Sequence, residues 1–87
     1  MENLRKEIDL IDDEMQSLFI KRLEIVKKIA LEKKNQGLEI LNQDREQEIL
    51  TRLANKIDDK YISGLYPKFI VNVMEISKIY QELLMKE

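Results

Sequence analysis

Apolar residues recur at steps of three and four along the first third of the chain. The main stripe consists of Leu4, Ile8, Ile11, Met15, Leu18, Ile25 and Ile29. This spacing is typical of a helix that buries one stripe of its surface. We therefore predict one long helix over Asn3–Gln36, with Asn3 as its N-cap and Gly37 as its C-terminal stop.

Charged side chains interrupt this pattern at positions where core residues are expected. Arg22 and Lys33 occupy two positions of the main stripe. Arg5 begins a neighbouring stripe whose members recur every seven residues. A buried charge is costly unless it is paired, so we expect these cations to face an anion. The helix dipole also favours a cation in a last turn, which is the simpler explanation of Lys33.

The rise of an α-helix sets the distances between these cations. Arg22 and Lys33 lie about 16 Å apart along the axis and within about 20° of one face, so both side chains can converge on one small molecule. Arg5 lies about 25 Å from Arg22 and cannot join them from its own helix. The helix is about 50 Å long, whereas a compact globule of this length has a radius of gyration near 12 Å.

Such a rod extends beyond any core that its own chain can build, and a second copy running antiparallel would cover the projecting part. If the two rods cross near Met15 and Gln16, the partner's Arg5 falls opposite the interval between Arg22 and Lys33. We therefore expect a homodimer with shared sites.

Two further helices are predicted. The second opens near Asn42 or Asp44 as its cap and has apolar positions at Ile49, Leu50, Leu53 and Ile57. The third begins either at Pro67 or near Asp59, in which case it tolerates a kink. Its stripe contains Ile70, Val73 or Met74, Ser77, Gln81 and Leu84. The expected fold is all-α, with three helices in a single domain over residues 1–87.

Polar residues lie at the ends of these later stripes too. Arg45 opposes the dipole in a first turn, so local helix physics does not explain it, whereas Glu46 suits that turn. Ser77 and Gln81 interrupt the third stripe one turn apart. A serine in a helix seam is commonly a filler bonded to the preceding turn, but a glutamine on the same face needs partners.

Composition narrows the chemistry. Charged residues make up 37% of the chain, the net charge is −2, and histidine and cysteine are absent. Disulfides, thiol chemistry and the commonest general base are thereby excluded. Without a basic tract or a long apolar run, we expect neither a nucleic-acid partner nor a membrane span, and a soluble cytoplasmic protein.

The inward-facing polar set suits a small dianion. It comprises Arg5, Arg22, Lys33, Arg45, Ser77 and Gln81, with Glu46 and Asn42 nearby. Two arginines can hold two carboxylates in a fixed relation, whereas a hard metal cation would need clustered carboxylates. We expect no metal and no cofactor. Because the set lacks a nucleophile–base pair, catalysis there would act through conformation and electrostatics.

The chain resembles the all-helical class of chorismate mutase over nearly its whole length. The matching pieces are LRKEID at residues 4–9, ID at 11–12, KR at 21–22, Lys33, DRE at 44–46, and Ser77 with Gln81. The resemblance implies an intertwined homodimer that rearranges chorismate to prephenate, on the branch leading to phenylalanine and tyrosine. The chain departs from the family pattern in two places. The family often has an aspartate where this chain has Asn42. The third helix of this chain carries Gly64 and Pro67, so the comparison does not fix where that helix starts.

The resemblance also implies roles for the polar residues. Arg22 and the partner's Arg5 would hold the two substrate carboxylates, and Lys33 with Gln81 would donate to the ether oxygen. Glu46 would accept from the ring hydroxyl, with Arg45 and Ser77 completing the lining and Asn42 beside them. Two alternatives stay open: an isochorismate pyruvate lyase of the same fold, and a non-catalytic helical dimerisation module whose polar residues fix the register.

Overall fold

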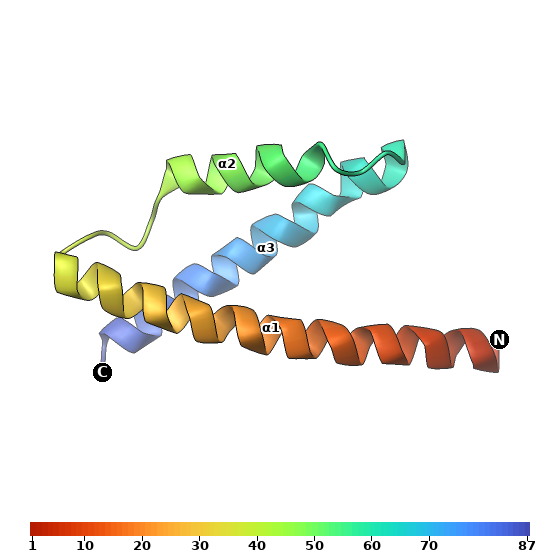
Figure 1. The fold of residues 1–87 in the computed structure, drawn as a ribbon, viewed down its shortest axis with the longest axis horizontal. Coiled ribbons are helices and arrows are strands. Elements are labelled where there is room, and N and C mark those ends of the chain that lie inside the picture. Colours follow the sequence, from red (N-terminus) through yellow and green to blue (C-terminus); the bar gives the residue numbers. More distant parts are fainter.

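The computed structural model describes residues 1–87 and contains three α-helices and no strand (Figure 1). Helix α1 spans Glu2–Gln36, α2 spans Gln43–Ala54 and α3 spans Lys60–Met85. The predicted all-α chain of three helices is confirmed. None of the three has a stretch long and apolar enough to cross a membrane.

The two ends of α1 differ in how well the sequence predicts them. The helix begins at Glu2, and the Arg5 N–H donates to the Met1 carbonyl at 3.0 Å. The prediction of Asn3 as N-cap is therefore wrong, because Asn3 lies inside the first turn. Gly37 does end the helix: its φ of 70° is left-handed, and the Leu38 N–H donates to the Lys33 carbonyl at 2.8 Å.

Side-chain caps fix the starts of α2 and α3. The Asn42 Oδ1 atom accepts from the Arg45 N–H at 3.0 Å, so Asn42 rather than Asp44 caps α2. The Asp59 carboxylate accepts from the N–H groups of Tyr61 and Ile62 at 2.8 and 2.9 Å. Of the two predicted starts of α3, the one near Asp59 is correct, and Pro67 lies inside the helix.

Both α1 and α2 pack on α3, but they do not pack against each other (Figure 1). The buried apolar residues are Val26 and Ala30 of α1 with Ile70 and Met74 of α3. Ser77 and Gln81 are also buried, so four members of the predicted α3 stripe do face the other helices. Only this narrow seam holds α1 in place.

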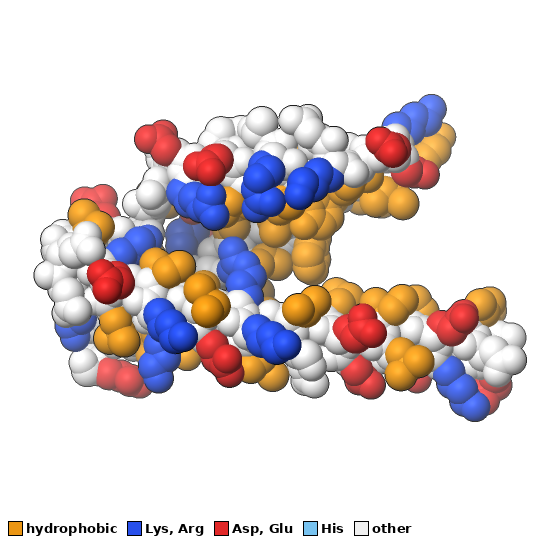
Figure 2. Space-filling model, in the orientation of Figure 1, with side chains coloured by type: hydrophobic (Ala, Val, Ile, Leu, Met, Phe, Trp, Pro, Cys, Tyr) orange, Lys and Arg blue, Asp and Glu red, His pale blue; other side chains and the backbone are white.

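The N-terminal half of α1 projects beyond the seam with its apolar stripe exposed (Figure 2). Leu4 is 60% exposed, Ile8 56% and Ile11 50%, although their spacing is that of a buried stripe. Next to them lies an apolar groove of about 760 Å³ between α1 and α3, lined mainly by Met15, Leu18, Phe19, Phe69, Ile70, Val73 and Ile76. The single chain thus leaves much of its apolar surface uncovered.

Candidate functional site

A cavity of about 330 Å³ lies among the three helices and the connector between α1 and α2. Each of these four segments contributes at least two side chains. The lining residues are Arg22, Val26, Ile29, Lys33, Ile40, Asn42, Arg45, Glu46, Ile49, Met74, Ser77, Lys78 and Gln81. Its existence follows from the packing, because α3 supports both α1 and α2 while those two stay apart.

Most of the polar residues predicted from the sequence line this one cavity: Arg22, Lys33, Asn42, Arg45, Glu46, Ser77 and Gln81. Arg5 does not. It lies on the projecting half of α1, where its side chain is exposed. Helix geometry had already placed Arg5 too far from Arg22 to act in the same site of its own chain.

Arg22 reaches across from α1 to α3. One of its guanidinium nitrogens (Nη1) donates to the Ser77 hydroxyl oxygen, and the same hydroxyl donates to the Val73 carbonyl at 2.9 Å. The Ser77 hydrogen is therefore occupied by backbone, as expected for a serine in a helix, and its oxygen is left as an acceptor. Ser77 orients Arg22 without neutralising its charge.

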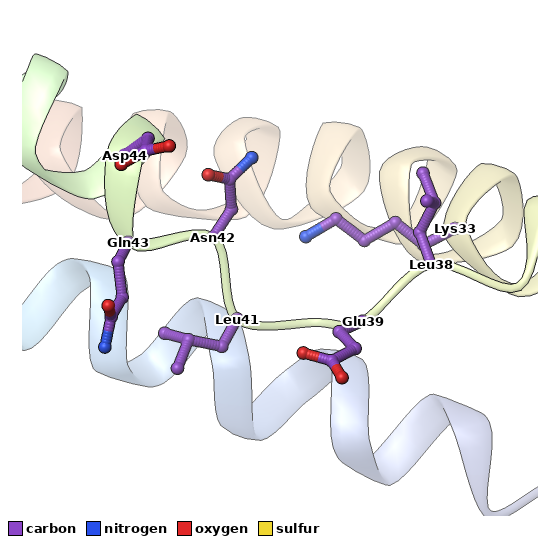
Figure 3. Close-up of a pocket in the computed structure, with 7 residues that line it drawn as sticks. All are labelled: Lys33, Leu38, Glu39, Leu41, Asn42, Gln43 and Asp44. Carbon is purple, nitrogen blue, oxygen red and sulfur yellow. The ribbon is translucent and has the colours of Figure 1, made fainter.

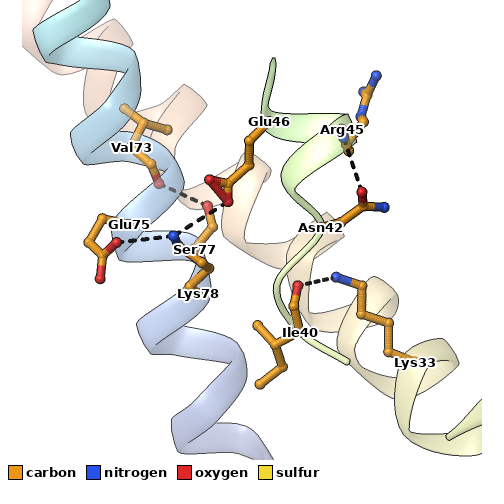
Figure 4. A network of polar contacts seen from close by, with 9 residues as sticks. All are labelled: Lys33, Ile40, Asn42, Arg45, Glu46, Val73, Glu75, Ser77 and Lys78. Carbon is orange, nitrogen blue, oxygen red and sulfur yellow. Dashed lines mark hydrogen bonds and ion pairs between the residues drawn. The ribbon is translucent and has the colours of Figure 1, made fainter. Parts of the chain in front are cut away.

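Lys33 reaches from the last turn of α1 to the connector. Its ammonium donates to the Ile40 carbonyl at 2.6 Å (Figure 4). Figure 3 shows the side chain extending toward Asn42 along a second hollow of about 530 Å³, lined by Lys33, Leu38, Glu39, Leu41, Asn42, Gln43 and Asp44. Lys33 thus lies between the two hollows, and its only partner in the chain is a neutral carbonyl.

The first turn of α2 supplies Arg45 and Glu46. Arg45 is exposed, and its guanidinium forms an ion pair with Glu48 at 2.9 Å, so it stands at the rim of the cavity. Glu46 points the other way, toward α3, where its carboxylate lies 3.4 Å from the Lys78 ammonium (Figure 4). Arg45 therefore faces solvent, whereas Glu46, the next residue, faces α3.

Gln81 lies one turn beyond Ser77 on the same face of α3. Its side chain is only 6% exposed, and its Oε1 atom has no hydrogen-bond partner. A buried polar atom without a partner costs about 1–3 kcal/mol, so natural chains retain one chiefly where it serves a purpose. This amide lies on the cavity wall.

Lys78 is the lining residue that sequence reasoning missed. It follows Ser77 directly and has Glu75 three residues before it, which is the usual pattern of an ordinary surface ion pair. The signal was weak because Glu46, its other partner, lies on a different helix. Hydrogen bonding to Glu75 raises the pKa of Lys78 above 10.5, burial opposes the rise, and the charge of Glu46 adds to it.

The cavity is positively charged in a chain whose net charge is −2. Four cationic side chains and one carboxylate line it, which gives a formal charge of +3. No cluster of three or more metal-ligating side chains occurs in the structure. The lining also contains no nucleophile next to a base, so the arrangement can bind and orient an anion and stabilise developing negative charge.

These features define a class: a helical protein with a cationic, partly apolar cavity for a small anion. Residues 4–87 match the family model described as chorismate mutase type II, so the chain belongs to that family. Comparisons with curated proteins and with solved structures gave no match. The family was the one indicated by the sequence, and its match covers all three helices.

The ion pairs of Lys78 give a testable consequence. Because the pKa of folded Lys78 lies above 10.5, its contribution to stability is complete below pH 10.5 and is lost as the pH rises through the folded value. Glu75→Gln removes the largest cause of the rise, so we expect the pKa of Lys78 to fall. A carbon-13 NMR titration of the lysine side chains measures it. Glu32→Gln, at an exposed position of α1 that takes part in no ion pair, is the control; an unchanged Lys78 pKa in Glu75→Gln contradicts the assignment.

Proposed function

We propose that this chain is a chorismate mutase that converts chorismate to prephenate, on the branch that leads to phenylalanine and tyrosine. The observation that carries the proposal is that Arg22 and Lys33 line one cavity, and both donate only to neutral oxygens. Two cations without carboxylate partners, in a member of this family, are suited to a dianionic substrate.

Substrate binding relies on the arginines. Arg22, already oriented by Ser77, holds one carboxylate of chorismate, and the partner's Arg5 holds the other. Fixing both carboxylates selects the compact conformer in which the two ends of the reacting system approach each other. This restriction of conformation supplies much of the rate enhancement of an intramolecular rearrangement.

Transition-state stabilisation relies on Lys33 and Gln81. The ether oxygen gains negative charge only as its C–O bond breaks, so donors to it act more strongly on the transition state than on the substrate. The Lys33 ammonium has three hydrogens and gives one to the Ile40 carbonyl. Gln81 lines the cavity, and the NH2 group of its amide is the part that can donate to the ether oxygen.

The other polar lining residues recognise the rest of the substrate. The Glu46 carboxylate accepts from the ring hydroxyl. Arg45 and Asn42, which line the cavity beside the start of α2, complete the polar lining. Because the Asn42 Oδ1 atom already caps α2, the NH2 group of Asn42 is the part offered to the substrate.

The site requires a second copy of the chain. We infer an antiparallel homodimer in which the projecting half of one α1 covers the apolar groove of the other. The exposed stripe of α1 and the groove beside it support this, since neither belongs on the surface of a stable monomer. The same arrangement would bring the partner's Arg5 to the cavity.

A non-catalytic dimerisation module is the second interpretation. In that interpretation the seam cations serve the dimer itself and should pair with its carboxylates. Within one chain neither Arg22 nor Lys33 takes part in an ion pair, and the ion pairs present involve Arg45 and Lys78 instead. An isochorismate pyruvate lyase of the same fold is distinguished by assay.

The assay supplies chorismate and isochorismate separately to the purified protein. We expect loss of chorismate absorbance with formation of prephenate, and no release of pyruvate from isochorismate. Lys33→Ala should reduce turnover of chorismate by at least about 10²- to 10³-fold while the helical content is kept, since it removes a preorganised cationic donor. Pyruvate release would identify a lyase, and absence of both reactions would refute an enzymatic function.

The proposed role of Gln81 predicts how the pH dependence of the activity changes on mutation. Gln81→Glu should confine activity to acidic solution, because the new carboxyl can donate a hydrogen bond only when it is protonated. The wild type should show no such acid requirement, since an amide donates at every ordinary pH. Steady-state rates between pH 5 and pH 8 test this. Full activity of Gln81→Glu at pH 8 would show that Gln81 does not donate to the ether oxygen.

The proposed shared site predicts that two inactive variants complement each other when their chains are mixed. Arg5→Ala and Arg22→Ala should each be inactive as homodimers, and mixing the two chains should restore activity, because a hybrid dimer has one intact site. Subunit exchange is verified by native mass spectrometry of differently labelled chains. If hybrids form and remain inactive, Arg5 does not act from the partner chain.

A further inference from the structure

One ion pair in the structure joins two different helices. Lys78 of α3 lies 3.4 Å from Glu46 of α2, whereas the other two ion pairs connect residues three apart on the same helix. Both ends of the joining pair are partly exposed, with side-chain exposures of 25% for Lys78 and 27% for Glu46. The pair also lies in the wall of the cavity.

Lys78 is held between two carboxylates. Glu75, one turn earlier on α3, lies 3.2 Å from its ammonium on the solvent side and is 58% exposed (Figure 4). Glu46 is on the cavity side. Since an ammonium has three hydrogens, both carboxylates can be satisfied at the same time. The raised pKa of Lys78 agrees with this arrangement and keeps the ammonium charged at neutral pH.

Glu46 needs such an anchor because it shares its cavity with other cations. A glutamate has three rotatable bonds, and both Arg22 and Arg45 line the same cavity. Pairing with either arginine would remove the acceptor from the ring hydroxyl, and pairing with Arg22 would also neutralise the cation that holds a substrate carboxylate. Arg45 is already paired outward with Glu48, so Lys78 is left as the partner of Glu46.

We propose that Lys78 is a positioning residue that holds the Glu46 carboxylate toward the cavity as the acceptor of the substrate's ring hydroxyl. This inference rests on the proposed chorismate mutase function and adds to it a residue that acts through Glu46. The ring hydroxyl does not react and is held alike in the substrate and in the transition state. Loss of its acceptor therefore weakens binding and raises KM more than it lowers kcat.

The experiment measures kcat and KM for chorismate with the wild-type dimer and with three variants. Lys78→Met should raise KM about fivefold, as expected for loss of a partly exposed ion pair, with kcat within a factor of two. Lys78→Arg keeps the charge and should recover most of the wild-type KM. Lys68→Met, at an exposed position of the same helix, is the matched control and should match the wild type. Lys78→Gln replaces Lys78→Met if that variant does not fold as a dimer.

A double-mutant cycle with Glu46→Gln tests whether Lys78 acts through Glu46. Adding Lys78→Met to Glu46→Gln should raise KM no further, because the anchored carboxylate is already gone. Additive effects would overturn the proposal, as would an unchanged KM in Lys78→Met or a loss confined to kcat. A wild type without activity on chorismate would refute the proposed function itself, and that outcome is distinct from a Lys78 variant that behaves like an active wild type.

Discussion

The separation of α1 from α2 is the constraint on which the rest of the structure depends. Each of these helices packs on α3 alone, and the connector spans the space between them. A three-helix chain whose helices all packed together would fill this space with apolar side chains. Here α3 instead turns Met74, Ser77 and Gln81 toward a cavity that α1 and α2 close from two sides.

The way in which the cations are held explains how the cavity keeps its charge. Arg22 and Lys33 are oriented by a hydroxyl and a backbone carbonyl, which fix a side chain without cancelling its charge. Arg45 and Lys78 are paired with carboxylates and contribute less to the attraction of an anion. The cavity therefore combines two cations that donate only to neutral oxygens with two cations that are paired with carboxylates.

The sequence predicts the elements and most of the cavity wall well, because both follow from helical periodicity. Ile70, Ser77 and Gln81 share one face by spacing alone, and Gly37 ends α1 because it can adopt a left-handed conformation. Contacts between helices are not encoded in this way. The Lys78–Glu46 pair joins residues 32 positions apart, which no local pattern reveals. The Glu75–Lys78 spacing instead suggests that Lys78 pairs only within its own helix. The predicted start of α1 is wrong for a different reason: Asn3 has the chemistry of a cap, but the helix begins before it, without a side-chain cap.

The positive cavity also bears on how a reaction there ends. An isomerisation leaves the number of carboxylates unchanged, so the proposed product would carry the same two negative charges as the substrate. The cations that attract the substrate therefore attract the product equally, and charge alone does not favour release of the product. Under the proposed function, release would come from the change in shape, because the product would no longer have the compact conformation that Arg22 and the partner's Arg5 select in the substrate. In such a site product inhibition is a built-in consequence of using fixed charge for recognition.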